Sequence, residues 1–343
     1  VWFLLAGAVL WDYQWLIVAV AAPVAAAVVG TGLVMLHRLI SEQRARRKTE
    51  ERFKSYLAPA VVDILVNNPH LDSMKPATRE LSIMFTDLAG FTTTAEKLGG
   101  ERTAAVLAKF LGSMTEIVQG TGATLDKYIG DAIMAFWGAP IEDPQHARHA
   151  CQAASAMIIA LDEMNARGDF GDAGPLVMRV GIATGEIMVG DFGNPPRNSS
   201  YTVIGDTANL ASRLEGANKA FGSRVLVNQA TKDRAGEGFV FRLVGFVRVK
   251  GRAGAEGLYE LLVPSGPRKD RLSDWATTSD KAVAAFRSAR FQECVACFEA
   301  LRRDFDDHGL AEVYLEEVAA LQARAAGGPL PGDFDGTITL TEK

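Results

Sequence analysis

Cysteine is scarce in this chain, which has only Cys151, Cys294 and Cys297 among its 343 residues. Three thiols cannot form the disulfide framework of a small secreted domain, so we expect most of the chain to lie in the cytosol. Cys294 and Cys297 are spaced like a metal or redox pair, but the sequence contains no second pair. We interpret them as small side chains on a helix.

An excess of one charge is also lacking. The chain has 36 Lys and Arg against 41 Asp and Glu, a net charge of −5, so nothing suggests that it binds nucleic acid. Hydrophobic residues make up 48% of the chain, which permits a sizeable core. The length fits one large domain with appendages, or two domains.

Charged side chains are nearly absent from the first forty residues. Trp15–Leu36 is an uncharged stretch of about 22 residues, long enough to cross a bilayer as a helix. A signal peptide fits poorly, because the basic residues (Arg38, Arg44 and Lys48 among them) follow the apolar stretch. We predict membrane-spanning segments within residues 1–40, in the cell (inner) membrane of a longer protein. The positive-inside rule places everything downstream in the cytoplasm.

Residues 41–77 form a connecting segment. Apolar residues from Phe53 to Leu65 recur at helical spacing, and Pro59 interrupts them. We interpret the segment as a dimerising signalling helix with a break, and a plain spacer is the alternative. Its end, with Pro69 and Pro76, is the linker into the main domain.

Strands and helices alternate between residues 78 and 265, with hairpins among them. One strand ends in Asp87, and two apolar strands meet at the turn Gly130–Asp131. Helices are expected over 101–119, 143–167 and 206–219. The pattern predicts an α+β fold with helices packed on an antiparallel-rich sheet.

The pattern changes after Pro264, which marks the start of a C-terminal segment at residues 266–343. Two helical stretches, Trp275–Leu301 and Leu310–Ala325, resemble a single tetratricopeptide-like hairpin. One such unit cannot bury its apolar face alone, so it should dock on the main domain, on a partner or on its own copy. The Pro/Gly-rich tail is expected to wrap a surface.

Asp87 and Asp131 should converge if their strands are neighbours in the sheet. Two carboxylates plus substrate phosphates are the usual ligands of Mg²⁺, and two such ions can activate a nucleophile and neutralise a leaving group. After Asp87, Gly90 and a helix start offer free N–H groups to phosphate, and Thr92–Thr94 should cap that helix. Each aspartate alone would be an ordinary acidic turn residue, but this combination suggests a metal–polyphosphate site.

Three motifs in order make a resemblance specific. They are Phe85–Thr92 (FTDLAGFT), Lys127–Asp131 (KYIGD) and Tyr201–Leu214 (YTVIGDTANLASRL), and Val249–Gly251 follows as a fourth. Together they resemble the class III nucleotidyl cyclase domain over residues 78–265, which implies a ferredoxin-like fold. The resemblance also implies cyclisation of a nucleoside triphosphate with release of pyrophosphate. The whole arrangement is similar to bacterial receptor adenylate cyclases whose extracellular CHASE2 sensor would lie upstream.

The resemblance implies roles for named residues. Two Mg²⁺ or Mn²⁺ ions per site would be bound by Asp87, Leu88 and Asp131. Asn209 and Arg213, which share one helix face, would orient the ribose and stabilise the pentavalent α-phosphate during attack by the ribose 3′-oxygen. Further substrate-binding residues would be Lys250, Gly90, Phe91 and Thr92. Without the resemblance, these positions would be a polar helix stripe, a strand lysine and a turn.

Lys127 and Thr202 are the base-reading pair that the resemblance implies. A lysine donor suits N1 of adenine and a hydroxyl acceptor suits its 6-amino group, whereas guanylyl cyclases of the family typically have glutamate and cysteine here. We therefore expect ATP as substrate. Threonine in place of the usual aspartate marks a subgroup whose members are often stimulated by bicarbonate. Asp206 is expected to cap the helix that carries Asn209.

In this family the metal aspartates come from one subunit and the remaining site residues from the other. The resemblance therefore implies a membrane-anchored adenylate cyclase that works as a homodimer with shared sites. A guanylate cyclase and a catalytically inactive nucleotide-binding dimerisation module are the alternatives. His146 and His149 lack a third ligand, so we interpret them as solvated helix-start residues and not as a zinc site.

Overall fold

The computed structural model describes residues 75–194, 198–248, 255–325 and 334–337 continuously, and parts of residues 2–41. The segment that we interpret as a signalling helix lies within residues 42–74, which are outside the described residues. Lys250 also lies outside the described residues. The chain divides into two compact units, and one of them includes all of His70–Lys343. The features below belong to that unit unless stated otherwise.

The apolar N-terminal segment is described only in part. Residues 26–38 are helical, while residues 12–25 lie outside the described part. Within the portions that are described, no helix combines the length and the apolar character needed to cross a bilayer. The membrane span over Trp15–Leu36 therefore stays a prediction.

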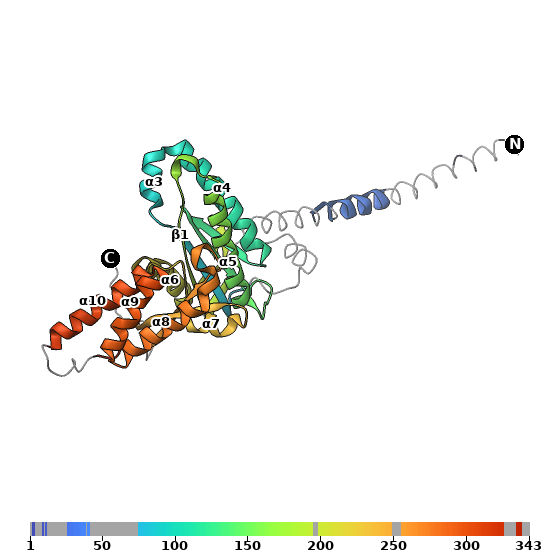
Figure 1. The fold of residues 1–343 in the computed structure, drawn as a ribbon. Coiled ribbons are helices and arrows are strands. Elements are labelled where there is room, and N and C mark those ends of the chain that lie inside the picture. Colours follow the sequence, from blue (N-terminus) through green and yellow to red (C-terminus); the bar gives the residue numbers. More distant parts are fainter. Residues whose placement is uncertain are drawn as a thin grey trace. The chain divides into compact units, whose positions relative to one another are not determined.

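A mixed sheet forms the centre of the unit that includes His70–Lys343 (Figure 1). Its strand order is β2-β3-β1-β4-β6-β8-β7, with β5 paired to β4. All described pairings are antiparallel except that of β4 with β6. The predicted antiparallel-rich sheet is confirmed. The strands are β1 (Ala77–Leu88), β2 (Thr124–Ile129), β3 (Ala132–Trp137), β4 (Met178–Asn194), β5 (Asn198–Ile204), β6 (Val225–Asn228), β7 (Val240–Arg248) and β8 (Ala255–Leu262).

Helices cover the sheet through two apolar clusters. Alternate residues of a strand face opposite sides, and β1 follows this rule, with Leu81 and Ile83 in one cluster and Met84 and Leu88 in the other. The first cluster includes residues of α6, α8, α9 and α10, and the second includes residues of α4 and α5. The helices are α3 (Phe91–Leu98), α4 (Gly100–Gly120), α5 (His146–Ala166), α6 (Asp206–Phe221), α7 (Gln229–Ala235), α8 (Leu272–Arg287), α9 (Phe291–Phe305) and α10 (His308–Ala325).

The C-terminal segment shares the core of the main domain. It contains three helices where two helical stretches were predicted, because the chain turns between α8 and α9, where Ala289 has a positive φ of 55°. Phe286 and Phe298 of this segment share one buried cluster with Phe221 of α6. In the tail, the Phe334 ring lies 5.5 Å from the Phe286 ring. Of the three docking surfaces considered from the sequence, the structure shows docking on the main domain (Figure 1).

The helix caps predicted for two helices are wrong. Helix α3 begins at Phe91, before the threonines, and its N-cap is Gly90 at φ 71°, with no side-chain cap bond among the described residues. Thr94 Oγ1 instead donates to the Gly90 carbonyl oxygen. In α6 the N-cap is Gly205, so Asp206 is already helical. In both cases a glycine with positive φ makes the turn into the helix one residue or more earlier than a side-chain cap would.

Gly181 allows β4 to lie directly against α6. A Cβ built on Gly181 would lie 2.2 Å from the Ala211 carbonyl oxygen and 2.2 Å from the Glu215 backbone nitrogen. We expect Gly181→Ala to lower the free energy of unfolding by about 3 kcal/mol or more, since backbone must move. Gly216→Ala is the control, because no described atom lies within 4 Å of a Cβ there. It should stabilise α6 by about 0.5–1 kcal/mol in denaturant unfolding, and equal effects would contradict the close-approach interpretation.

Candidate active site

Asp87 and Asp131 lie next to one another. Asp87 is near the end of β1, and Asp131 lies in the turn between β2 and β3. Because β1 pairs with β3, the turn is held beside the end of β1. The Leu88 backbone N–H donates to Asp131 Oδ2 at 3.2 Å. The neighbouring strands therefore bring the two carboxylates together, as their placement in the sequence suggested.

The electrostatics of this acid pair favour a cation. Burial raises the pKa of Asp87, the Asp131 carboxylate raises it further, and Arg179 on β4 opposes both effects. Across the described residues, no group of three or more His, Cys, Asp or Glu side chains is close enough to hold a metal by itself. Two hard oxygen donors that leave the remaining positions to phosphate and water fit the way Mg²⁺ is usually bound.

Glu215 is a third carboxylate beside this pair, which the sequence reasoning missed. Burial raises its pKa to about 7, and the charges of Asp87 and Asp131 contribute to the rise. Its Oε1 is buried and has no hydrogen-bond partner among the described residues. Its position two residues after Arg213 gave no signal in the sequence. Glu215 adds negative charge to the acid pair when it is ionised.

The predicted base-reading residues also come together. Thr202 on β5 donates a hydrogen bond from Oγ1 to Asp126 Oδ2, and Lys127 Nζ lies 3.3 Å from Asp126 Oδ1. The Lys127 side chain is 46% exposed, whereas that of Asp126 is fully buried. Lys127 and Thr202 therefore flank one carboxylate, which the sequence reasoning did not single out.

Helix α6 carries site residues on two different sides. Asn209 and Arg213 are exposed, and they are four residues apart, so they share one face. Glu215 is about 200° around the helix from Arg213 at 3.6 residues per turn, on the side of the acid pair. Asn209 and Arg213 therefore face away from the acid pair of their own chain.

The turn after Asp87 is available to a ligand mainly through its backbone. Gly90 and Thr92 are exposed, and no described atom lies within 4 Å of a Cβ built on Gly90. Phe91 is only 5% exposed and belongs to the cluster beneath α4. Phe91 can therefore contribute its N–H group but not its side chain, which restricts the role that the resemblance implied.

Neither histidine of the α5 start belongs to a metal site in the described structure. His149 Nδ1 lies 2.7 Å from Asp143 Oδ2. His146, expected to be solvated, is 7% exposed, and its Nδ1 lies 2.8 Å from Ser82 Oγ. That expectation was wrong for His146, because the helix start is packed on β1. Burial lowers the pKa of His146, and the nearby Glu80 carboxylate opposes the shift.

The cysteine pair lies on α9, as the sequence interpretation required. Burial raises the pKa of Cys294 to about 12 and that of Cys151 to about 12 as well. Thiols with such pKa values contain almost no thiolate at neutral pH, which makes them poor metal ligands and poor redox groups. Helix packing is the role that the structure favours for Cys294.

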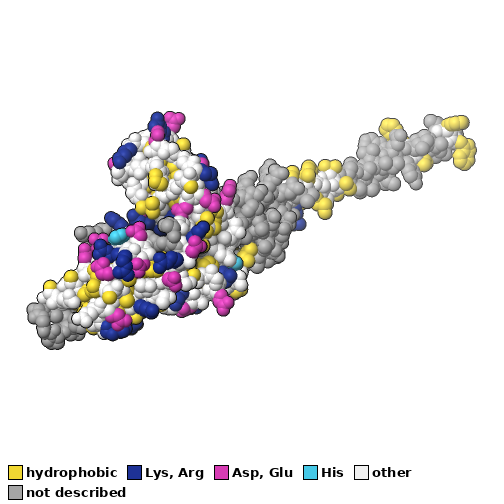
Figure 2. All heavy atoms as spheres, in the orientation of Figure 1, with side chains coloured by type: hydrophobic (Ala, Val, Ile, Leu, Met, Phe, Trp, Pro, Cys, Tyr) yellow, Lys and Arg dark blue, Asp and Glu magenta, His cyan; other side chains and the backbone are white. Residues whose placement is uncertain are grey.

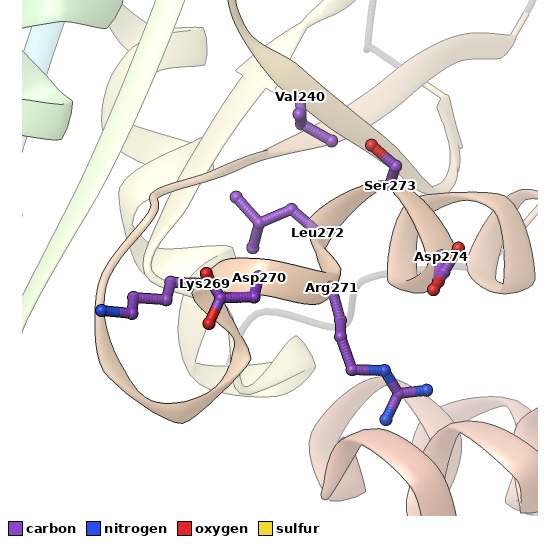
Figure 3. Close-up of a pocket in the computed structure, with 7 residues that line it drawn as sticks. All are labelled: Val240, Lys269, Asp270, Arg271, Leu272, Ser273 and Asp274. Carbon is purple, nitrogen blue, oxygen red and sulfur yellow. The ribbon is translucent and has the colours of Figure 1, made fainter.

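The cavity in Figure 3 lies at the start of α8, away from the acid pair. It is lined by residues 269–274 and Val240 and has a volume of about 230 Å³. None of the predicted site residues lines it. Of the predicted acid and base-reading residues, Lys127 is exposed, whereas Asp87, Asp131 and Thr202 are partly buried.

Comparison with known proteins identifies the family. Residues 74–262 match the family described as adenylate and guanylate cyclase catalytic domain. Adenylate cyclase 1 of Rhizobium meliloti (strain 1021) is 34% identical over 210 residues, or 61% of this chain and 31% of that protein. The first curated relatives are matched over only 9% to 43% of their own length.

Solved structures agree with this match. The adenylyl cyclase CyaB from P. aeruginosa is 32% identical with a TM-score of 0.51, over 57% of this chain and 99% of that chain. The guanylyl cyclase Cya2 is 30% identical with a TM-score of 0.50, over 57% of this chain and 97% of that chain. The sheet, the acid pair and the sequence match together show that this chain belongs to the adenylate and guanylate cyclase catalytic-domain family.

Proposed function

We propose that this protein is an adenylate cyclase that converts ATP to 3′,5′-cyclic AMP and pyrophosphate in intracellular signalling. The observation that carries the proposal is that Lys127 and Thr202 both contact Asp126. Asp126 and Thr202 are 76 positions apart in the sequence. The two contacts place an ammonium donor and a hydroxyl side by side, the pair that suits N1 and the 6-amino group of adenine. Relatives named adenylate cyclases support the same substrate.

Asp87 and Asp131 would hold two Mg²⁺ or Mn²⁺ ions per site, with Leu88 orienting Asp131 through its N–H group. When bound, such ions make the ribose 3′-hydroxyl more acidic and neutralise charge on the pyrophosphate. The two carboxylates are half-buried and repel one another, so the positive charge of bound ions would stabilise them. Phosphate oxygens would complete the coordination.

The other residues position the substrate. The Gly90–Thr92 turn offers backbone N–H groups at the start of α3 to the phosphates. Asn209 orients the ribose, and Arg213 stabilises the charge that develops on the α-phosphate, because its planar guanidinium can donate to two oxygens. Lys250 binds the triphosphate. In this scheme most of the rate acceleration comes from positioning and electrostatics.

The placement of site residues on two sides of α6 supports a homodimer. Arg213 and Asn209 face away from Asp87 of their own chain, so a second chain would supply these groups to the nucleotide at each acid pair. The hairpin tip exposes Tyr128 and Ile129 at 46% and 52%, apolar surface that a second copy would cover. Each of two sites would then combine the acid pair of one chain with the base-reading pair, Asn209 and Arg213 of its partner.

Membrane anchoring is part of the proposal. The helix at residues 26–38 exposes large apolar side chains, for example Leu33 at 61% and Met35 at 66% (Figure 2). Basic residues follow it, which favours a cytoplasmic position for the catalytic domain at the cell (inner) membrane.

Guanylate cyclase activity is the second candidate, favoured by the similarity to the guanylyl cyclase Cya2. It is opposed by Lys127, since an ammonium cannot accept a hydrogen bond from the N1–H of guanine. An inactive dimerisation module is opposed by the presence of every expected site residue in the sequence.

Product analysis distinguishes these candidates. The full chain, purified in detergent because of its apolar first forty residues, is incubated with Mg²⁺ or Mn²⁺ and either ATP or GTP. Cyclic AMP and pyrophosphate should appear in equal amounts, with ATP strongly preferred. Cyclic GMP alone would overturn the base assignment, and the absence of both products would support the inactive module.

A further inference from the structure

A β-bulge lies inside the base-reading strand. The register between β2 and β3 shifts between Leu125 and Lys127, so Asp126 is the additional residue. Thr124, Leu125 and Asp126 are buried in succession, and exposure begins at Lys127. Bulges of this kind re-aim side chains next to functional sites. Here the bulge turns a carboxylate inward, where it contacts both Lys127 and Thr202.

Asp126 has one contact to each of these residues. Its Oδ2 accepts the Thr202 hydroxyl proton, and its Oδ1 lies 3.3 Å from Lys127 Nζ. The second contact has ion-pair distance but not hydrogen-bond geometry, so Oδ1 has no hydrogen-bond partner in the described part of the chain. A carboxylate with a 0% exposed side chain is costly to bury, which indicates that its position is not incidental.

We propose that Asp126 is a positioning residue that makes Thr202 selective for adenine. The inference rests on the proposed adenylate cyclase activity and adds a residue to its specificity. By taking the hydroxyl proton, Asp126 leaves only the lone pairs of Thr202 Oγ1 to face the base. The 6-amino group of adenine can donate to those lone pairs, and the O6 atom of guanine cannot.

This selectivity needs Asp126 because a free hydroxyl is ambiguous. A threonine side chain can donate one proton or accept at two lone pairs, and it rotates to suit its partner. A Thr202 without a buried acceptor could donate to the O6 of guanine as readily as it accepts from adenine. An ionised carboxylate is acceptor-only, so it fixes the direction of the bond.

Asp126→Asn reverses this direction with almost no change in shape. The Lys127 ammonium near Oδ1 attracts the amide oxygen, so the NH₂ group faces Thr202. Thr202 then accepts from the amide, and its own proton becomes free to bind O6 of guanine. We expect the ratio of kcat/KM for ATP to that for GTP to fall about tenfold, the effect of one hydrogen bond.

The test is a double-mutant cycle on the full chain with Thr202→Val, which removes the hydroxyl at constant shape. In the Thr202→Val background, Asp126→Asn should change the ATP/GTP ratio by less than about twofold, because the group through which it acts is gone. Asp172→Asn, at a side chain that is 74% exposed, is the control and should leave the ratio unchanged. Thermal unfolding of each variant identifies losses of fold.

Two results would overturn the role of Asp126. One is an unchanged ATP/GTP ratio in Asp126→Asn, and the other is an equal effect with and without the Thr202 hydroxyl, which a merely structural role would give. A wild-type chain that forms no cyclic nucleotide would contradict the proposed function instead. The ratio of ATP to GTP dissociation constants in the same variants would then still decide the role of Asp126.

Discussion

Asp87→Asn is expected to reduce cyclic nucleotide formation by about 10³-fold or more while leaving the metal-free protein folded. The substitution removes one of the two carboxylates that would hold the metal ions. It also removes a charge that is unfavourable without metal, because burial and Asp131 both raise the pKa of Asp87. Without metal, thermal stability above neutral pH should therefore be unchanged or higher. Activity and stability should move in opposite directions.

The measurement combines a product assay with thermal unfolding in chelator. The sign follows from linkage: the raised pKa of Asp87 means that its ionised form destabilises the fold as pH rises through that pKa, and Asn carries no such charge. Asp172→Asn is the matched control, since this exposed aspartate pairs only with Arg102 across the surface in the contacts described. Full activity in Asp87→Asn would remove the acid pair from the mechanism.

Asp307→Ala is expected to destabilise the whole catalytic unit by about 3 kcal/mol. Asp307 lies between α9 and α10, and its Oδ2 accepts from the guanidinium of Arg242 on β7 and, at 2.9 Å, from Trp275 Nε1. Arg242 is 1% exposed and also donates to Glu260 at 2.6 Å. Without Asp307, a buried guanidinium keeps a single carboxylate partner, and the Trp275 indole loses its acceptor.

Surface aspartates of the same segment should behave differently. Asp304→Ala removes an exposed pair with Arg303, which solvent screens, so this variant should lose far less stability than Asp307→Ala. Denaturant unfolding of the two variants and the wild type gives the comparison. If both variants lost equally little stability, the C-terminal helices would be an appendage and not part of the core. The same docking is visible at Gly309, where a Cβ would lie 2.6 Å from the Phe221 carbonyl oxygen of α6.

The docking places the C-terminal segment against elements that carry proposed site residues. It packs on α6, the helix that carries Asn209 and Arg213, and on β7 and β8, whose connection contains Lys250. The sequence indicated a helical unit that needed a covering surface. It could not show which surface, because the contact between Asp307 and Arg242 joins residues 65 positions apart.

Local signals in the sequence predicted local structure well. The Gly130–Asp131 turn closes a hairpin with Ile129 opposite Ala132, as its two-residue connection suggested. The convergence of Asp87 and Asp131 followed from two strand ends in one sheet. Helix starts were less predictable, because Gly90 and Gly205 determine them through backbone conformation, whereas the polar residues nearby looked like better caps.

The direction of side chains at irregular backbone positions could not be predicted from the sequence. Asp126 would point to the opposite face from Lys127 in a regular strand, and only the bulge shows why its carboxylate meets Thr202. Glu215 is one of two acidic residues on α6, and its place beside the acid pair depends on how Gly181 lets that helix approach β4. Both depend on packing between distant segments.

The most direct test of the shared-site account is subunit complementation. Chains with Asp87→Asn and chains with Asn209→Ala, each inactive alone, are mixed in equal amounts and allowed to exchange. Half of the dimers should be mixed, and each mixed dimer should have one intact site, so about a quarter of the wild-type activity is expected. Mixed dimers that are confirmed to form and yet remain inactive would contradict the account.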